Sequence, residues 1–326
     1  MHVRSLFQIV PESAPFNRRR LVVGAVMVVL GFLIPLEGSK YLMTVFSMAY
    51  FYVILSISWN LISGYTGYLS FGHSMFIGIG AFTTFILFGS YNVHWLLALF
   101  VAGLLAVAVA VLVGIPSLRI KGVYFAIAML VLNEVVKLMA EGPLRFLTNG
   151  TQGITVFTGP SVQTLYYAFG TLAIVTVLVS MFIVNTKLGL HMRAIREREQ
   201  VAESIGVHTT GTKLFAFAVS AFFPAIAGGL YAFTISYIDP SVVFDLRFTL
   251  EMTVMTIIGG IGTIAGPLVG ALTFGLLSEV LILSAPEVFQ IALGTFLIIV
   301  VLFVPGGLHA AVSSVRVRRL MDRFRS

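Results

Sequence analysis

The chain has 326 residues, of which 58% are hydrophobic and 10% are charged, and its mean hydropathy is +1.02. Soluble globular domains carry about 25% charged residues, so this composition excludes a water-soluble surface and indicates a polytopic membrane protein. The net charge of +7 is typical of basic cytoplasmic loops and requires no nucleic-acid partner. Because the chain contains no cysteine, disulfides and thiolate metal sites are excluded.

Apolar runs recur along the chain at the length that a membrane helix needs, about 20 residues. They predict an all-α polytopic membrane helix bundle of about ten (nine to ten) transmembrane elements. The expected spans are residues 20–36, 41–62, 73–90, 94–115, 122–140, 162–185, 213–236, 251–262, 266–284 and 287–304. The eighth span is too short to cross a bilayer alone, so we expect a half-helix or part of an interrupted helix there.

Basic residues concentrate in every second connection between these spans. The basic connections and ends contain Arg4, Arg18, Arg19, Arg20, Arg119, Lys121, Lys187, Arg193, Arg196, Arg198, Lys213, Arg316, Arg318, Arg319, Arg323 and Arg325. The opposite connections contain Glu37, Glu141, Asp239, Asp245 and Glu287, with Lys40, Arg145 and Arg247 as their basic residues. Cytoplasmic loops are enriched in Lys and Arg, so we expect both termini and the loop 187–213 in the cytoplasm. The predicted organisation is a cytoplasmic segment 1–19, one transmembrane domain 20–310 and a basic cytoplasmic tail 311–326.

Residues 64–82 read GYTGYLSFGHSMFIGIGAF and place five glycines among their first seventeen residues. Inside lipid, non-helical backbone survives only where protein or water satisfies its amide groups. Close helix packing through small residues explains the pattern, and so does a translocation path along an interrupted helix. For the path, the candidate residues in and near this segment are Asn60, Gly64, Gly67, Ser70 and His73.

A weak internal repeat relates this segment to a second glycine-rich one. A shift of 195 residues superposes Gly64, Gly67 and Gly80 on Gly259, Gly262 and Gly275. Paired interrupted helices are typical of transporters built from repeats, and both a parallel and an inverted relation remain open here. Gly259, Gly260 and Gly262 therefore join the candidate path residues.

A second polar group, Asn133, Glu134 and Lys137, falls within the expected span 122–140. Glu134 and Lys137 are three residues apart and can pair on one helix face. An ionisable residue inside a membrane helix is a functional candidate, which adds Asn133 and Glu134 to the path residues. A lysine that extends towards the interface, balanced by the carboxylate, explains the pair equally well.

No motif for catalysis or for a cofactor is evident. Residues 206–213, GVHTTGTK, approach a phosphate-binding loop, but Thr212 separates Gly211 from Lys213, which should be adjacent. The six histidines show no metal-ligand spacing, and no nucleophile lies with a base. We expect no catalytic residue, no metal and no cofactor in this chain.

The loop KLGLHMRAIREREQVAESIGVHTTGTK, residues 187–213, combines charge with apolar residues at helical intervals. The apolar residues are Ala194, Ile195, Val201, Ala202 and Ile205. This spacing predicts a short amphipathic helix that ends at Gly206. An amphipathic helix outside the membrane suits docking on a partner through its apolar residues.

The segment GLHMRAIREREQVAESIGVHTTGTKLFAFAVSAFFPAIAGGLYAF resembles the coupling segment and following helix of permease subunits of bacterial branched-chain amino-acid ABC importers. It is most similar to the M-type subunit of the leucine, isoleucine and valine system. SWNLISGYTGYLSFGHSMFIGIGAF, KGVYFAIAMLVLNEVVKLM, IGGIGTIAGPLVGA and VPGGL resemble the same family in the same order. The resemblance covers residues 40–310.

The resemblance implies a transport subunit, not an enzyme, in the bacterial inner membrane. Its expected partners are a sister permease, two cytoplasmic ABC ATPase subunits and an extracytoplasmic solute-binding protein. The residues that match the coupling motif are Arg193, Ala194, Glu197, Ala202, Glu203 and Gly206. ABC importers often carry Glu-Ala-Ala, three residues and Gly, whereas residues 200–202 are Gln-Val-Ala, which leaves the exact docking contacts open.

The implied substrates are branched-chain amino acids, and related small solutes such as urea or amides fit the same scaffold. The alternative function is a self-sufficient ion-coupled secondary transporter or channel for small solutes. That alternative predicts an unpaired carboxylate or an ion site within the membrane, and it assigns no task to the amphipathic segment 187–213.

Overall fold

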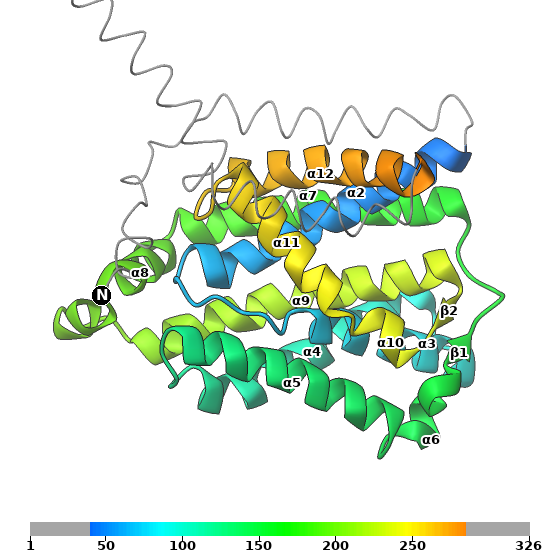
Figure 1. The fold of residues 1–326 in the computed structure, drawn as a ribbon, viewed down its shortest axis with the longest axis horizontal. Helices are drawn as coiled ribbons and strands as arrows, with labels where there is room; N and C mark the ends of the chain where they lie inside the picture. Colours follow the sequence, from blue (N-terminus) through cyan, green and yellow to red (C-terminus); the bar gives the residue numbers. More distant parts are fainter. Residues whose placement is uncertain (1–39, 285–326) are drawn as a thin grey trace, which may run out of the picture.

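The computed structural model of the protein describes residues 40–284, with side chains described up to residue 275. Most of this part is helical. Its elements are α2 (Lys40–Trp59), η3 (Asn60–Gly64), α3 (Ser74–Tyr91), α4 (Trp95–Ser117), α5 (Val123–Glu141), α6 (Arg145–Thr148), η4 (Gly150–Gln152), β1 (Ile154–Thr155), α7 (Val162–Val184), α8 (Lys187–Ser204), α9 (Thr209–Ile235), β2 (Tyr237–Ile238), α10 (Pro240–Val243), α11 (Leu246–Gly259) and α12 (Ala265–Ser284). Figure 1 shows the long helices side by side, with α8 at one end of the bundle and β1 and β2 at the other.

Six helical segments are long and apolar enough to cross a membrane, namely α2 with η3, α3, α4, α5, α7 and α9. They agree within a few residues with the spans expected between 41–62 and 213–236. This agreement confirms an all-α polytopic membrane fold for the described residues. The expected spans 20–36 and 287–304 and the segments 1–19 and 311–326 lie outside the described residues, so the total of about ten elements stays a prediction.

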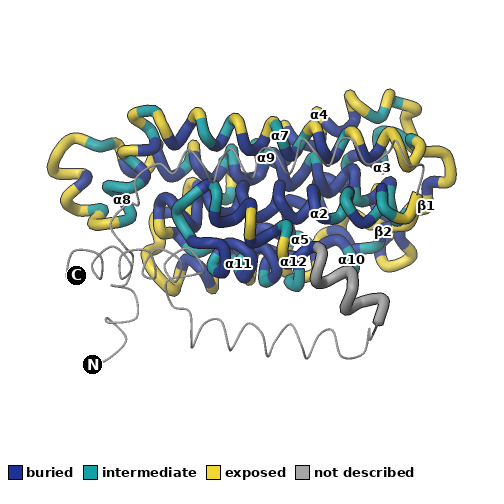
Figure 2. The backbone as a smooth tube through the Cα atoms, turned by 90° about the horizontal axis from the view of Figure 1, so that it is seen from above, coloured by how far each residue is buried: buried dark blue, intermediate teal, exposed yellow. Residues whose placement is uncertain are grey.

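The helix α9 lies at the centre of the bundle. It packs against α2, α3, α4 and α7, and Figure 2 shows its backbone mostly buried while the outer turns are exposed. Rings from several helices fill this core: Phe51 stacks on Tyr231 at 5.1 Å and meets Phe169 edge to face at 6.2 Å. At the end opposite α8, β1 and β2 pair as an antiparallel ladder, with Ile154 opposite Ile238.

α3 begins inside the bundle and is called a half-helix for that reason, although its 18 residues are long and apolar enough to cross a membrane. After η3 the chain runs back as a non-helical segment, 65–73, before α3 starts at Ser74. His73 Nε2 lies 3.1 Å from Ser220 Oγ, and Ser220 is near the middle of the 27-residue helix α9. The N-terminus of α3 is therefore about halfway through the bundle.

α11 is the half-helix expected at 251–262, and it begins earlier, at Leu246. The amide of Ser74 donates a hydrogen bond to Thr249 Oγ1 over 2.9 Å, so the first turns of α3 and α11 lie side by side. Gly78, one turn further along α3, packs against Phe244, which precedes α11. The two half-helices thus start at the same depth and run in opposite directions (Figure 1).

The contacts between α2 and α11 define the relation between the glycine-rich repeats. Thr256 Oγ1 donates to the Ser56 carbonyl over 3.2 Å, and the Gly262 amide donates to Asn60 Oδ1 over 2.8 Å. Along both helices the contacting residue numbers increase in the same direction, so α2 and α11 are parallel. The two segments related by the shift of 195 residues therefore have the same orientation. α2, α3 and α4 run opposite to α9, α11 and α12, respectively (Figure 1), which is the arrangement that an inverted repeat requires.

Glycines let α3 and α9 approach closely. A Cβ atom on Gly80 would overlap the Ala225 carbonyl, and one on Gly228 would overlap the carbonyl of Ile77. These contacts involve backbone atoms that cannot turn aside. The expected role of Gly80 and its neighbours in close helix packing is therefore seen directly.

We expect Gly228→Val to destabilise the bundle by at least about 1–3 kcal/mol, because overpacking at a backbone contact forces α3 and α9 apart. Gly211→Val is the matched control in the same helix, since no atom lies within 4 Å of a Cβ atom there. Thermal unfolding of both variants in detergent, followed by size-exclusion chromatography, measures the difference. Equal midpoints for the two variants would contradict the packing.

Candidate functional site

The amphipathic segment expected at 187–213 forms α8, a short turn and the start of α9. α8 is kinked at Arg198, where the backbone adopts φ −155° and ψ 106°. It ends at Ser204, and Gly206 then takes a left-handed φ of +87°, which glycine adopts without strain. The predicted end at Gly206 is therefore correct, whereas the expected single helix consists of two short arms.

The apolar residues of α8 divide between two faces. Ile195 and Ala202 are buried against the bundle, with 3% and 1% of their surface exposed. Val201 and Ile205 point away from it and are 51% and 70% exposed. A helix that presents apolar side chains on both faces can bind the bundle on one side and a partner on the other.

The predicted coupling residues follow the same division. Glu197, Glu203 and Gly206 are exposed, Arg193 and Ala194 are half-buried, and Ala202 is buried. Glu203 accepts a hydrogen bond from Thr209 Oγ1 over 2.8 Å, which closes the turn into α9. A shallow hollow lies beside this turn and is lined by residues 206–211 together with Glu203.

Arg196 joins α8 to both glycine-rich segments. Its Nη1 donates a hydrogen bond to the Gly64 carbonyl over 2.6 Å. Its side chain also packs against Gly67, and its guanidinium occupies the space that a Cβ atom on Gly262 would need. The glycines at 67 and 262 therefore make room for a cation from α8, and Gly64 supplies the carbonyl that binds it.

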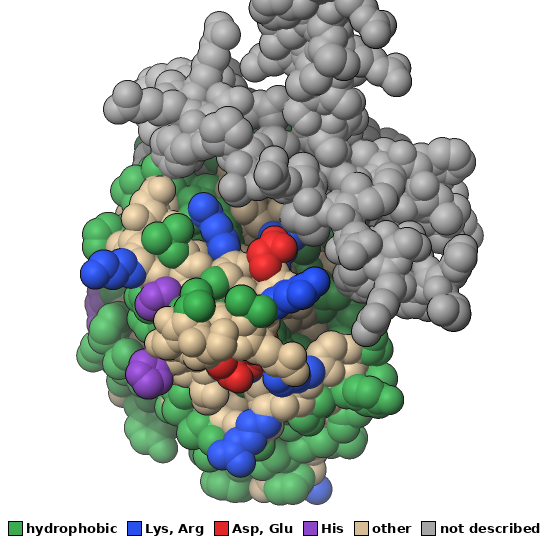
Figure 3. Space-filling model, turned by 90° about the vertical axis from the view of Figure 1, so that its left-hand side faces the viewer, with side chains coloured by type: hydrophobic (Ala, Val, Ile, Leu, Met, Phe, Trp, Pro, Cys, Tyr) green, Lys and Arg blue, Asp and Glu red, His purple; other side chains and the backbone are tan. Residues whose placement is uncertain are grey.

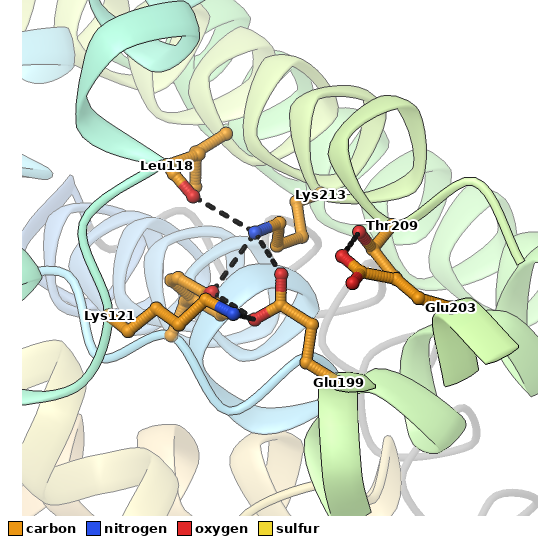
Figure 4. A network of polar contacts seen from close by, with 7 residues as sticks. Leu118, Lys121, Glu199, Glu203, Thr209 and Lys213 are labelled. Atoms are coloured by element: carbon orange, nitrogen blue, oxygen red, sulfur yellow. Dashed lines mark hydrogen bonds and ion pairs between the residues drawn. The ribbon is translucent and has the colours of Figure 1, made fainter. Parts of the chain in front are cut away.

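Glu199 forms a second attachment, shown in Figure 4. Its Oε1 pairs with Lys213 Nζ over 2.7 Å, and its Oε2 accepts a hydrogen bond from the Tyr68 hydroxyl. Lys213 Nζ also donates to the Leu118 carbonyl over 2.9 Å and to the Tyr68 hydroxyl over 3.0 Å. Lys121 lies 3.7 Å from Glu199 at the edge of this network. The network ties α8 to α9, to segment 65–73 and to the α4–α5 connection.

The Glu199 carboxyl is electrostatically stabilised. Burial alone would raise the pKa of this carboxyl. Hydrogen bonds from Lys213 and Tyr68 and the charges of Lys213 and Lys121 outweigh burial and hold the pKa below its ordinary value. A depressed carboxyl pKa contributes stability above the pKa of the unfolded chain, and this stability is lost as pH falls through the folded pKa. The attachment of α8 is therefore complete near neutral pH and weakens only in acid.

Asn60 connects the two predicted path segments. Its Nδ2 donates to the Thr263 carbonyl over 2.8 Å, while its Oδ1 accepts from the Gly262 amide over 2.8 Å. The side chain thus satisfies backbone groups in the bend between α11 and α12. This junction is surrounded by four glycines that are candidate path residues: Gly64, Gly259, Gly260 and Gly262. The contact between the two segments was not predicted from the sequence.

Ser70 and His73 belong to the buried hydrogen-bond network of the non-helical segment 65–73. Trp59 Nε1 donates to the Ser70 carbonyl over 2.8 Å. His73 Nδ1 lies 2.9 Å from Ser70 Oγ, and its Nε2 contacts Ser220 Oγ of α9. Trp59 and Ser63, whose Oγ accepts from the Ser70 amide over 3.2 Å, satisfy backbone groups of this segment, as non-helical backbone inside a membrane requires.

Asn133 and Glu134 lie on different faces of α5. Asn133 is buried, where its Oδ1 accepts from Ser74 Oγ and its Nδ2 donates to the Phe244 carbonyl, over 2.9 and 3.0 Å. It therefore holds together the starts of both half-helices. Glu134 lies on the bundle surface, with 54% of its side chain exposed, and pairs with Lys137 at 3.6 Å.

Several residues of these networks were not predicted from the sequence. Arg196 and Lys213 were expected among the basic loop residues without partners, and Tyr68 and Glu199 had no predicted role. Asp245 and Arg247 were expected in an outer connection, whereas α11 includes Arg247 and Glu251, which pair at 2.8 Å. The spacing of Arg247 and Glu251, i to i+4, is the signal that could have identified this pair. Among the described residues, no group of three or more His, Asp or Glu could hold a metal.

Comparison with known proteins relates this chain to membrane permeases. A model of the family described as branched-chain amino acid transport system / permease component matches residues 41–302. The permease protein LivM of the high-affinity branched-chain amino acid transport system of Salmonella typhimurium is 27% identical, over 84% of this chain and 71% of the relative. LivM of Escherichia coli is 26% identical, over 86% and 73%. LivH of Salmonella typhimurium is 24% identical, over 79% and 90%. No solved structure matches the chain significantly.

We expect Glu199→Ala to lower the stability of the folded chain by about 3 kcal/mol, because it leaves the buried Lys213 ammonium without its counter-charge. The double variant Glu199→Ala/Lys213→Met should recover part of this loss. Lys121→Ala is the control: Lys121 is 57% exposed, so its loss should cost less than about 1 kcal/mol. Thermal unfolding in detergent measures all three, and similar effects for Glu199→Ala and Lys121→Ala would contradict the network.

Proposed function

The chain belongs to the family of permease components of branched-chain amino acid transport systems, and we propose that it is a membrane-spanning subunit of an ATP-driven ABC importer. In this proposal it translocates branched-chain amino acids, or related small solutes such as urea or amides, across the inner membrane of a bacterium. It pairs with a sister permease. Two cytoplasmic ABC ATPase subunits supply energy, and an extracytoplasmic solute-binding protein delivers the solute. The chain itself is a transport subunit.

The observation that carries this proposal is the double attachment of α8. Val201 and Ile205 are exposed beyond the end of the bundle, while Arg196 and Glu199 bind the interrupted helices beneath. A force on the exposed face of α8 would therefore be transmitted to Gly64 and Gly262 through the Arg196 guanidinium. ATP-driven movement of a partner would be transmitted in this way to the backbone breaks of α2–α3 and α11–α12, where little helical hydrogen bonding resists rearrangement.

The charge distribution supports a cytoplasmic position for α8. Figure 3 views the bundle from the α8 end, where Lys and Arg side chains predominate over Asp and Glu. Cytoplasmic loops of membrane proteins carry such an excess. With α8 in the cytoplasm, the ladder of β1 and β2 lies on the outer side, where a solute-binding protein would dock. An even number of crossings would then place both termini in the cytoplasm.

The alternative of a self-sufficient ion-coupled transporter requires an unpaired carboxylate within the membrane. The described membrane segments do contain a buried carboxylate, Glu251, but its Oε1 is paired with Arg247. The alternative also leaves the exposed apolar face of α8 without a role. We therefore favour the ATP-driven importer.

We expect the double variant Val201→Glu/Ile205→Glu to lower solute uptake at least about tenfold, because charged groups replace the apolar anchors of a docking surface. Phe157→Glu is the matched control for ATPase recovery: Phe157 is 92% exposed at the opposite end of the bundle, so its substitution should leave pull-down of the ATPase subunits unchanged. Uptake in the native host and pull-down of the ATPase subunits measure the effect. Normal uptake and normal ATPase recovery by the α8 variant would exclude docking at this face.

Arg196→Ala should separate docking from transport. The exposed docking residues are unchanged, so the ATPase subunits should still bind, whereas uptake should fall at least about tenfold because a charge-assisted hydrogen bond to the Gly64 backbone is lost. Arg198→Ala, at an exposed position two residues away, should leave uptake unchanged. Uptake and ATP hydrolysis are measured in the same membranes. Tight coupling in Arg196→Ala would argue against transmission through this residue.

A further inference from the structure

Three charged residues, Asp245, Arg247 and Glu251, lie in the first turns of α11, about halfway along the length of the bundle. Asp245 caps the helix, with its Oδ1 accepting from the Arg247 amide over 2.8 Å. Arg247 Nε donates to Glu251 Oε1 over 2.8 Å. Thr249, between them, contacts Ser74 at the start of α3. Ser74 lies about halfway along α9, and therefore about halfway through the bundle. A carboxylate and a guanidinium are therefore present at mid-bundle depth.

The cluster is partly satisfied and partly accessible. Glu251 is fully buried, and its Oε2 has no hydrogen-bond partner among the described residues. Arg247 keeps 38% of its side chain exposed, and Asp245 is exposed. An unpartnered buried oxygen beside accessible charges is an incomplete polar site, because burial without a partner costs free energy.

The two broad faces of the bundle differ in charge. α4 and α7 contain no charged residue, and the large side chains that they expose, such as Leu104 and Leu178, are apolar. α5 and α11 lie on the opposite face of the bundle (Figures 1 and 2) and carry Glu134, Lys137, Asp245 and Arg247. Exposing such groups to hydrocarbon costs several kcal/mol each, on the order of 2.5–3.5 at a helix centre. The α4–α7 face therefore suits lipid, and the α5–α11 face suits water or protein.

We propose that Asp245, Arg247 and Glu251 form a recognition site for the zwitterionic head group of an amino acid within the translocation path. The proposal rests on the importer function above and names the chemistry that its path would recognise. The Arg247 guanidinium receives the solute carboxylate, since Arg binds carboxylates through a planar fork of donors. The solute ammonium lies beside the exposed Asp245 carboxylate, while the fully buried Glu251 carboxylate holds the Arg247 guanidinium in position.

The surroundings of the cluster fit an apolar solute side chain. Tyr231 lies within electrostatic reach of all three charged residues, and its ring meets that of Phe248 at 5.5 Å. The hydroxyl of Tyr52 lies beside Arg247 and Glu251. Aromatic walls with a few convergent charges are typical of small-molecule sites. Neutral amides and urea lack the carboxylate, so this site favours amino acids among the solutes considered.

Thiol accessibility tests whether this face meets water. The natural chain has no cysteine, so Asp245→Cys, Leu246→Cys and the control Leu104→Cys each introduce one thiol in the full chain in native-host membranes. A charged, membrane-impermeant thiosulfonate should modify the first two at least about tenfold faster than the control, because the reactive thiolate forms only in water. Leucine should slow the reaction at Leu246→Cys, which keeps the Asp245 carboxylate. Rates equal to that of Leu104→Cys, or rates that leucine leaves unchanged, would overturn the site.

Uptake of radiolabelled leucine separates this site from the proposed function. The double variant Arg247→Gln/Glu251→Gln removes both charges together and leaves no uncompensated carboxylate, so it should fold and assemble. We expect its uptake to fall at least about tenfold, with Arg247→Lys intermediate because a lysine keeps the charge without the fork of donors. If the wild-type chain with its partners imports neither leucine nor urea or amides, the proposed function fails. If it imports urea or amides but no leucine, the recognition site is wrong and the importer remains. If wild-type uptake is normal and the folded double variant matches it, the recognition site is wrong and the importer remains.

Discussion

The structure depends on how interrupted backbone is satisfied inside an apolar bundle. Segment 65–73 and the bend at 260–264 break their helices at depths where lipid offers no hydrogen bonds. Side chains supply those bonds: Asn60 binds the bend, Trp59 binds the Ser70 carbonyl, and Arg196 binds the Gly64 carbonyl. Glycines at the same places remove the Cβ atoms that would block these approaches. The breaks are thus maintained by a small number of polar contacts, which is where a transporter can change shape at low cost.

Much of the fold could be predicted from the sequence because the membrane imposes a simple rule on helix length and polarity. The six long helical segments follow directly from apolar runs near 20 residues. The eighth expected element was recognised as incomplete for the same reason, although α11 begins at Leu246, earlier than expected. Asp245 and Arg247 obscured that start, because charged residues near an expected boundary are interpreted as loop. Asp245 is in fact the cap of the helix, and Arg247 pairs one turn along with Glu251.

The candidate site was harder to predict because its partners are distant in sequence. The glycines at 64 and 262 were identified from their repeat. Arg196, the cation that contacts both of them, was used only as one of the basic residues that indicate a cytoplasmic loop. Glu199 and Lys213 are 14 residues apart, and Tyr68 is a further 145 residues from Lys213. No pattern of nearby residues in the sequence predicts such a network. The amphipathic pattern of α8 was visible in the sequence, but which apolar residues face the bundle depends on the kink at Arg198.

The half-helix α11 connects the charged cluster at mid-bundle depth to the bend beside α8. Its first turn carries the cluster of Asp245 and Arg247 at mid-bundle depth, and its last residue, Gly259, leads into the bend where Gly262 contacts Arg196 of α8. A helix of 14 residues spans about 21 Å, at 1.5 Å per residue, and moves as a rigid rod. In the proposed importer, a displacement of α8 that shifts this bend would also shift the charged cluster, and a solute bound at the cluster would resist or favour the same displacement. Coupling between the two proposed sites would be reciprocal for this reason: the helix that transmits movement from α8 into the membrane would also transmit the effect of a bound solute back to α8.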